Sequence, residues 1–246
     1  MNIRLSIDCY KGVDGSSLSQ TRCFQIIQVY EMLEKMGSKV ITYVDIQDEA
    51  ERIRIFGSTK AKSAIRTFFP LLKKIRFVDY DGQFAANSCF TELGTQFVLT
   101  CRAISSITDD TPNKDLVLNK LIKIKQRYQI KGLINMFNDP EYNDHNIWIA
   151  LKLLKTFRVI HWNEFLYSLY CIDNGKSLED AINEIRLNKE EIDLYNFRNE
   201  DNKELPNTCY SYIRSFLEEC GIISKVSSQE SKITNEAEMF FSTINI

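Results

Sequence analysis

Six basic residues lie in the segment Gly57–Arg76, which contains no acid. Ammonium and guanidinium groups bind phosphate oxygens, and arginine also makes paired hydrogen bonds to the edge of guanine. The whole chain of 246 residues has a formal net charge of only -2, so the positive charge is a local feature. The segment therefore predicts a surface for a polyanion. The six residues are Lys60, Lys62, Arg66, Lys73, Lys74 and Arg76.

The charge is also divided unequally along the chain. Residues 1–131 hold 20 Lys and Arg against 14 Asp and Glu, which gives +6, and residues 132–246 hold 11 against 19, which gives -8. A polyanion should prefer the first half. The acidic second half suits a protein partner.

Signals for enzyme chemistry are weak in this sequence. Neither His145 nor His161 lies in a metal-binding spacing such as HExxH, and no GxxxxGK[ST] or GxSxG motif occurs. An acid followed by a separated acid-x-Lys pair, the arrangement of a metal-dependent nuclease, was not found either. We predict no catalytic residue, metal site or cofactor. A divergent nuclease would have to use Asp139, Glu141 or Asp144.

Cysteine usage and hydropathy indicate a cytoplasmic protein. The seven cysteines include no CxxC pair, and most have hydrophobic neighbours, so we expect reduced, buried thiols. No run approaches the roughly 18 apolar residues of a membrane span, and the N-terminus lacks the apolar core of a secretion signal. We expect no membrane contact.

The spacing of apolar residues predicts the helices and strands that position the basic segment. Apolar residues at spacings of three and four predict a helix over Ser19–Met36, ended by Gly37. A short strand at Val40–Val44 and a helix from Asp45 to Phe56 follow. The basic segment forms a third helix, Lys60–Lys74, and two strands, Phe77–Tyr80 and near Cys89 and Phe90, form a hairpin. This is the element order of a winged helix-turn-helix.

The same order occurs twice in the chain. Val29–Ile41 is similar to Ala150–Ile160 at an offset of about 119. Two further pairs of segments match at offsets of 145 and 143. They are Leu71–Val78 with Phe216–Ile223, and Phe90–Phe97 with Ile233–Phe240. The larger offset places some 26 extra residues before the third helix of the second copy, in an acidic insert at 177–204.

The predicted architecture is mainly α with short β-hairpins, an α+β class. Two winged helix-turn-helix modules are joined by a basic helix. The domains are residues 1–111 for the first module, 112–142 for the linking helix, and 143–246 for the second module with its acidic helical insert, 177–204. We expect the two modules to pack through the linking helix.

In a helix-turn-helix, the recognition helix presents its N-terminal residues to base edges, and flanking bases contact phosphate. Polar residues at helical spacing on the third helix therefore predict the DNA-binding surface. In the first module the predicted contacts are Thr59, Lys60, Lys62, Ser63, Arg66, Lys73 and Arg76. In the second module they are Asn207, Thr208, Tyr210, Ser211 and Arg214.

The pattern AIRTFFPLLKKIRFVDYDG followed by CFTELGTQF resembles the recognition portion of type IIS restriction endonucleases, in which winged-helix modules read DNA. Where the third helix turns into the wing, the second copy has Gly221 and the first has Arg76, which adds a base near the wing. Cleavage in those enzymes resides in a separate domain. The resemblance therefore implies recognition without cleavage in this chain.

The leading hypothesis is sequence-specific binding of double-stranded DNA, as the recognition component of a restriction-type system. A nuclease or other protein subunit would bind the acidic second half. The alternative is a winged-helix scaffold in a chromosome-segregation, replication or regulatory complex. Loss of partner binding on deletion of residues 177–204, with DNA affinity unchanged, would favour the alternative.

Overall fold

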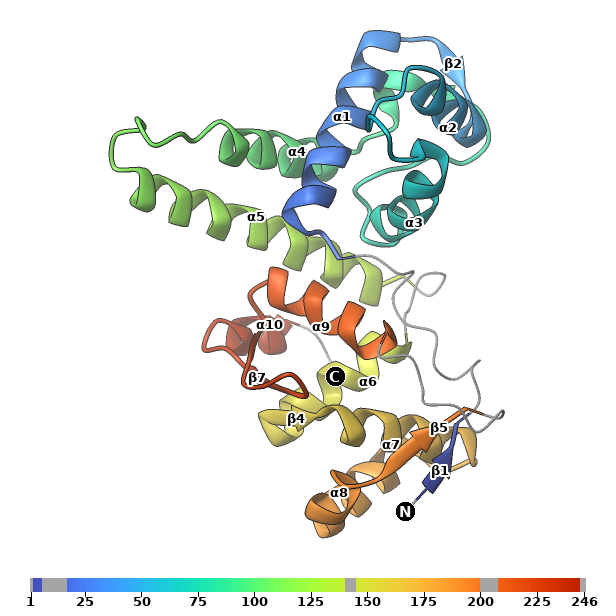
Figure 1. The fold of residues 1–246 in the computed structure, drawn as a ribbon, viewed down its shortest axis with the longest axis vertical. Coiled ribbons are helices and arrows are strands. Elements are labelled where there is room, and N and C mark those ends of the chain that lie inside the picture. The colour runs from blue at the N-terminus through green and yellow to red at the C-terminus, as the bar shows by residue number, and fades with distance from the viewer. Residues whose placement is uncertain (1, 6–16, 140–144, 200–207, 244–246) are drawn as a thin grey trace. The chain divides into compact units, whose positions relative to one another are not determined.

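The computed structural model describes residues 2–5, 17–139, 145–199 and 208–243. Within these ranges the chain is mostly helical with a few short strands, which confirms the predicted α+β class (Figure 1). The five cysteines whose side chains the structure describes are free thiols and are buried, as predicted: Cys23, Cys89, Cys101, Cys171 and Cys220.

The chain divides into two compact units. One is Ser16–Tyr142, and the other joins Met1–Gly15 to Asn143–Ile246. Strand β1 (Asn2–Arg4) explains the second grouping, because it runs parallel to β5 (Asn196–Arg198). The predicted boundary at 142 coincides with this division, whereas no division occurs at 111 and residues 2–5 group with the second unit.

Helix α1 (Gln20–Met36) opens the Ser16–Tyr142 unit as the periodicity predicts. The Ser19 hydroxyl caps it by accepting the Arg22 N–H at 3.3 Å. Gly37 ends it, with φ 60° and ψ -133°, and donates its N–H to the carbonyls of the last turn. One face of α1 is buried through Cys23, Ile26, Ile27, Val29, Met32 and Leu33.

Helix α2 (Tyr43–Arg52) begins and ends earlier than predicted. Its N-cap is Thr42, and Asp45 is the third helical residue, where its carboxylate accepts the Thr42 N–H at 2.7 Å. The two residues form a reciprocal capping box, so an acid that resembled a cap is the cap's partner. Because α2 begins at Tyr43, the preceding strand β2 (Val40–Ile41) is shorter than predicted.

Helix α3 (Ala61–Lys74) carries the basic segment, and Pro70 lies inside it. After α3, the chain forms a short antiparallel pair between β2 and β3 (Phe84–Ala85), with a single bridge from Val78 to Phe90. The 3-10 turn η2 (Ala86–Ser88) follows β3. The two strands predicted at Phe77–Tyr80 and near Cys89 and Phe90 are therefore reduced to this single bridge, and the regular pairing lies between β2 and β3 instead.

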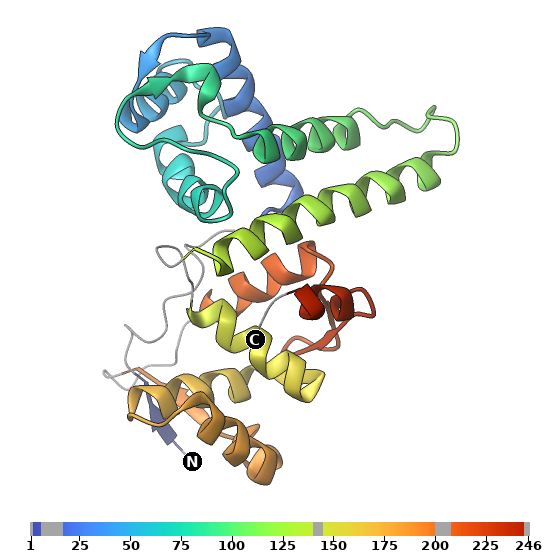
Figure 2. The same ribbon diagram turned by 180° about the vertical axis from the view of Figure 1, so that it is seen from behind.

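Helices α4 (Glu92–Ser105) and α5 (Lys114–Phe137) complete this unit as an antiparallel pair. Figures 1 and 2 both show the far ends of the two helices extending together away from α2 and α3. The linking helix predicted within residues 112–142 is α5, and it packs on α4 and α3 as part of the Ser16–Tyr142 unit.

The second unit contains β1, β5 and a three-stranded antiparallel sheet of β4 (Val159–His161), β6 (Ile223–Lys225) and β7 (Glu230–Ile233), in the order β4–β7–β6. Helix α8 (Leu178–Ile192) lies in the predicted acidic insert, begins with a Ser177–Asp180 capping box and packs on α7 (Trp162–Asp173). The other helices of the described part of this unit are α6 (His145–Phe157), α9 (Thr208–Glu219) and α10 (Ala237–Thr243).

The two units repeat the same backbone turn after α3 and α9. The Phe77 N–H donates to the Leu72 carbonyl at 2.8 Å, and the Ile222 N–H donates to the Leu217 carbonyl at 3.0 Å. Each pair is related by the predicted offset of 145. The sequence repeat therefore corresponds to a structural repeat at this turn.

A threonine closes this turn in both units. The Thr91 hydroxyl donates to the Arg76 carbonyl at 2.7 Å, and the Thr234 hydroxyl donates to the Gly221 carbonyl at 2.6 Å. Arg76 has φ 59° and Gly221 has φ 76°, so both residues occupy the left-handed region. Arg76 and Gly221 differ in residue type between the two copies, but both have a left-handed backbone conformation.

Gly37→Ala is expected to lower the free energy of unfolding by about 1.5 kcal/mol, because φ 60° with ψ -133° is a region that residues with a side chain rarely enter. No atom lies within 4 Å of the added Cβ, so backbone strain is the whole cost. Urea unfolding followed by circular dichroism measures it. Ser38→Ala is the control, and equal stability of the two variants would contradict the assignment.

Candidate nucleic-acid interface

Helix α3 separates a buried face from a polar exposed face. Its buried side chains pack into the unit's core, where Phe68 and Phe69 are fully covered. Ser63, Arg66 and Thr67 are exposed on the other side. Thr59 and Lys60 are exposed immediately before the helix. The division between faces that the spacing predicted is therefore observed.

Lys60 and Arg66 have no carboxylate partner among the residues that the structure describes. Lys60 is the N-cap of α3, where its side chain makes no capping hydrogen bond. Arg66 donates its Nε–H to the neutral Gln47 Oε1 at 3.1 Å, which orients the guanidinium without neutralising it. Both positive charges remain available to an external anion.

Lys62 has a different environment, because α2 supplies acids beside it. Its ammonium forms an ion pair with Asp48, and its backbone N–H donates to Glu51 Oε2 at 3.1 Å. A carboxylate thus already occupies the N-terminal end of α3, where the helix dipole would favour a phosphate. Contacts with DNA would have to come from exposed side chains rather than from the end of the helix.

The bases at the end of α3 also have acidic partners. Lys73 Nζ lies 2.5 Å from Asp81 Oδ1 and sits over the Tyr80 ring. Arg76 forms an ion pair with Asp139. The predicted positive surface is therefore divided by neighbouring acids, which the linear run in the sequence does not show.

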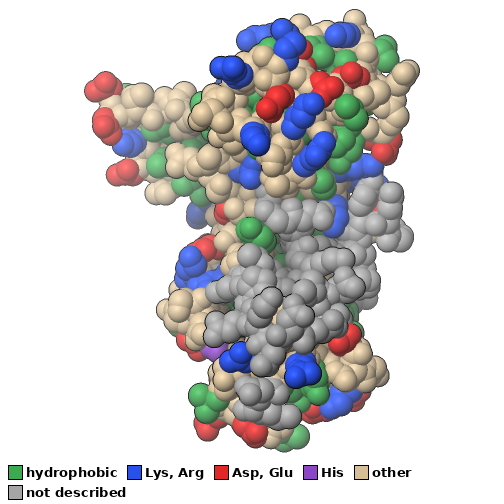
Figure 3. Space-filling model, turned by 45° about the vertical axis from the view of Figure 1, so that its right-hand side comes forward, with side chains coloured by type: hydrophobic (Ala, Val, Ile, Leu, Met, Phe, Trp, Pro, Cys, Tyr) green, Lys and Arg blue, Asp and Glu red, His purple; other side chains and the backbone are tan. Residues whose placement is uncertain are grey.

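The nuclease hypothesis gains no site from these positions. Asp139 is engaged by Arg76, while Glu141 and Asp144 lie outside the described residues. Figure 3 shows Lys and Arg side chains interspersed with Asp and Glu on one face of the Ser16–Tyr142 unit. The surface is one of mixed charge, so specific positions matter more than net charge.

Two of the residues predicted to contact DNA from α9, Tyr210 and Arg214, have buried side chains. Tyr210 is 3% exposed and packs against the rings of Trp162 and Phe165, and burial raises the pKa of its phenol to about 12. Arg214 is 5% exposed and donates to the carbonyls of Ser227 and Ser228, both at 2.5 Å. Arg214 therefore holds the turn between β6 and β7, and neither side chain is exposed as the prediction required.

The sequence repeat already indicated that Tyr210 and Arg214 are buried. At an offset of 145, Tyr210 corresponds to Ile65 and Arg214 to Phe69, which are core positions of α3. Ser211 corresponds to Arg66 and is partly exposed. Asn207 and the side chain of Thr208 lie outside the described residues.

Sequence reasoning also missed three residues around α3. Thr67 is exposed beside Arg66, Gln47 orients Arg66, and Glu51 covers the first turn. Helical spacing alone places Thr67 next to Ser63 and Arg66 on the exposed face. The contributions of Gln47 and Glu51 depend on how α2 packs against α3, which the sequence pattern did not reveal.

Other kinds of site find no support in the described parts of the chain. No group of three or more His, Cys, Asp or Glu side chains is arranged there to hold a metal ion. None of the helices in those parts is long and apolar enough to cross a membrane. No protein family, curated protein or solved structure matches this chain.

Proposed function

We propose that this protein binds double-stranded DNA in a sequence-specific manner, and that both units are winged helix-turn-helix modules. The exposed face of α3 is the main contact. A restriction-type system, in which a separate nuclease subunit cleaves, is the context that the sequence resemblance adds. The proposal rests on three kinds of support: element order, the repeated turn and the exposed polar face of α3.

The order of elements supports the winged-helix assignment. In the Ser16–Tyr142 unit, α1, β2, α2 and α3 are followed by a chain reversal that returns through β3 to pair with β2. In the other unit, α6, β4, α7 and α9 are followed by β6 and β7, and β7 lies between β4 and β6. A winged helix uses three helices and three strands. The second unit has all of them, with α8 and β5 as an insertion, and the Ser16–Tyr142 unit has the three helices, two strands and the Val78–Phe90 bridge.

The single observation that carries the DNA proposal is the exposed polar face of α3. Lys60, Ser63, Arg66 and Thr67 lie at helical spacing, opposite a buried face that anchors the helix. In this architecture the third helix enters the major groove, where arginine, serine and threonine read base edges. Two of these four side chains are cations without an acidic partner among the described residues.

The scaffold alternative is favoured by a specific feature of the second unit. On α9, the positions that correspond to Lys73 and Lys74 are Glu218 and Glu219, and both are partly exposed. Acids at the end of a recognition helix repel phosphate. We therefore propose that the Ser16–Tyr142 unit dominates DNA affinity and that the second unit contributes a protein contact.

The double variant Lys60→Ala, Arg66→Ala is expected to weaken DNA binding about 10- to 100-fold, because each side chain contributes about 1 kcal/mol or more to a groove or phosphate contact. Fluorescence anisotropy with duplexes enriched from a random library, at two salt concentrations, measures the change. A selected sequence motif in the wild-type chain is part of the expected result.

A charge-matched control separates recognition from general electrostatics. Lys120→Ala, Lys123→Ala removes the same two charges from exposed positions of α5. This control should bind within about twofold of wild type at moderate salt. Equal weakening of both double variants would overturn the α3 assignment, and absence of binding at low salt would favour the scaffold function.

A further inference from the structure

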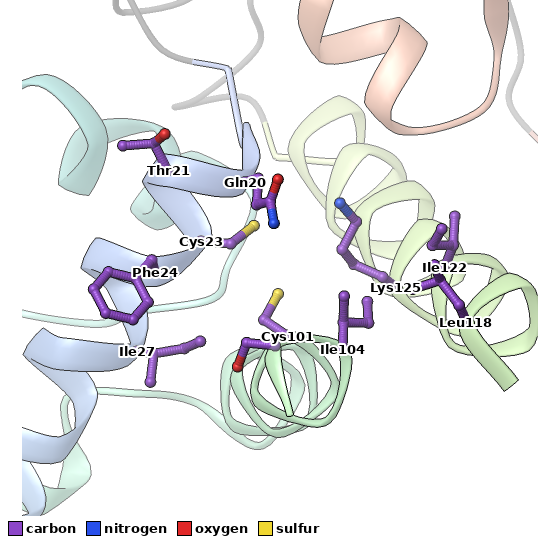
Figure 4. A pocket seen from close by; sticks show the side chains of 11 residues that line it. Gln20, Thr21, Cys23, Phe24, Ile27, Cys101, Ile104, Leu118, Ile122 and Lys125 are labelled. Carbon is purple, nitrogen blue, oxygen red and sulfur yellow. The ribbon is translucent and has the colours of Figure 1, made fainter. Parts of the chain in front are cut away.

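The Ser16–Tyr142 unit contains an apolar cavity that the proposed DNA function does not use. Its volume is about 570 Å³, inside the range of roughly 300–1,000 Å³ that is usual for small-molecule sites. Helices α1, α4 and α5 form its walls, so the whole cavity belongs to one unit (Figure 4). The exposed face of α3 contributes none of the residues that line it.

The wall on α5 consists of aliphatic side chains that the fold leaves incompletely covered. Leu118 and Ile122 line the cavity, and neither is buried. On α1, the Phe24 side chain also lines it and is 56% exposed. Exposed apolar side chains that cluster in a concave part of the surface are typical of binding sites.

One positively charged side chain, that of Lys125, lines this apolar cavity. Of the 11 described residues that line the cavity, Lys125 is the charged one, and Figure 4 shows its side chain extending from α5 on the side of Gln20. Lys125 forms no ion pair with a described residue. None of the described residues that line the cavity carries a carboxylate, so the lining itself does not balance this charge.

The Cys101 thiol, which also lines the cavity, does not balance this charge either. Contact with Cys23 and burial raise the pKa of the Cys101 thiol far above its ordinary value, while the Lys125 charge opposes the rise. A thiol with a raised pKa remains neutral at physiological pH. Cys23 donates its S–H to the Leu18 carbonyl, with the atoms 3.2 Å apart.

We propose that this cavity binds a small amphipathic carboxylate, with its apolar part between α1, α4 and α5 and its carboxylate on Lys125. A second copy of the chain is a less suitable occupant. Exposed Lys120, Lys123 and Arg127 lie on α5 beside the cavity, and a two-fold contact through this face would bring like charges together. A small anion is instead attracted by the same charges.

The test compares ligands that differ in head-group charge. Decanoate and decyltrimethylammonium are titrated into the full chain by isothermal calorimetry, without DNA. Wild type should bind decanoate at least 10-fold more tightly than the cation, because a charge-assisted hydrogen bond in an apolar site contributes a factor of this size. Lys125→Glu should reverse the preference, which a folding defect would not do. Lys123→Glu, on an exposed position of the same helix, should keep the wild-type order.

A second variant tests the location. Ser105 is exposed and lines the cavity, so Ser105→Trp should obstruct the cavity and abolish decanoate binding while the thermal unfolding temperature stays within a few degrees of wild type. Equal affinity of wild type and Lys125→Glu for decanoate would overturn the proposal. A dimer in sedimentation experiments that Ser105→Trp dissociates would also overturn it, because a second copy would then fill the cavity.

Discussion

Gly94→Ala is expected to destabilise the Ser16–Tyr142 unit by about 3 kcal/mol, because α4 has no room for a methyl group at this position. A Cβ on Gly94 would lie 1.9 Å from the Phe77 carbonyl oxygen and 2.7 Å from its carbon. The obstacle is backbone, so no side-chain rotation relieves the overlap. The same carbonyl accepts the Thr91 N–H at 3.1 Å, which fixes it at the start of α4.

Urea unfolding monitored by far-ultraviolet circular dichroism measures this loss, because the affected unit is largely helical. Thr95→Ala is the matched control, since Thr95 follows Gly94 on the same helix and is only partly buried. The control should change the free energy of unfolding by no more than about 0.5 kcal/mol. Equal stabilities of the two variants would show that α4 moves away from Phe77 without cost.

Helix periodicity and repetition predicted the parts of the fold that depend on local sequence. The helices α1, α3 and α5 lie close to their predicted ranges because their apolar spacings and end signals are contained within each segment. The repeat offsets predicted the shared turn after α3 and α9. Contacts between distant segments, such as the pairing of β1 with β5, had no comparable local signal.

The candidate site was predictable only in part, for the same reason. Helical spacing identified the exposed Ser63 and Arg66, yet the pairing of Lys62 with Asp48 depends on the packing of α2 against α3. In α9, polar atoms on Tyr210 and Arg214 suggested a binding surface, whereas their large side chains are buried. A polar residue type does not by itself indicate an exposed side chain. Long side chains can be buried while their polar atoms form hydrogen bonds inside the protein or are covered by neighbouring residues.

Lys189→Met is expected to cost about 2 kcal/mol of stability at pH 7, because it leaves the buried carboxylate of Glu164 without its cation. The Glu164 side chain is fully buried and pairs with Lys189, whose side chain is 44% exposed. The full cost of breaking a buried pair is larger, but solvent around Lys189 already weakens this one. Glu164 keeps one other interaction, because its Oε2 accepts the His161 N–H at 2.7 Å.

The cost should depend on pH in a defined direction. Burial raises the pKa of Glu164 above its ordinary 4.5, and hydrogen bonding to Lys189 and to the His161 N–H opposes this rise. Removing Lys189 removes an interaction that lowers the pKa of Glu164, so this pKa rises further above its value in the unfolded chain. The folded variant therefore keeps the Glu164 proton to a higher pH than the unfolded chain does. The favourable contribution of the protonated carboxyl is present below pH 4.5 and is lost as pH rises through the folded-state pKa. The difference from wild type should therefore be small near pH 4 and largest above the folded-state pKa.

Two further variants make the electrostatic cause testable. Lys176 is also 44% exposed, but its partner Glu184 is 32% exposed, so Lys176→Met should cost no more than about 0.5 kcal/mol. Adding Glu164→Gln to Lys189→Met removes the buried charge and retains an acceptor for the His161 N–H. The double variant should therefore regain most of the stability at pH 7 and lose the pH dependence. If Lys189→Met instead destabilises the protein equally from pH 4 to pH 8, the cost comes from lost packing of the lysine stem rather than from an unpaired carboxylate.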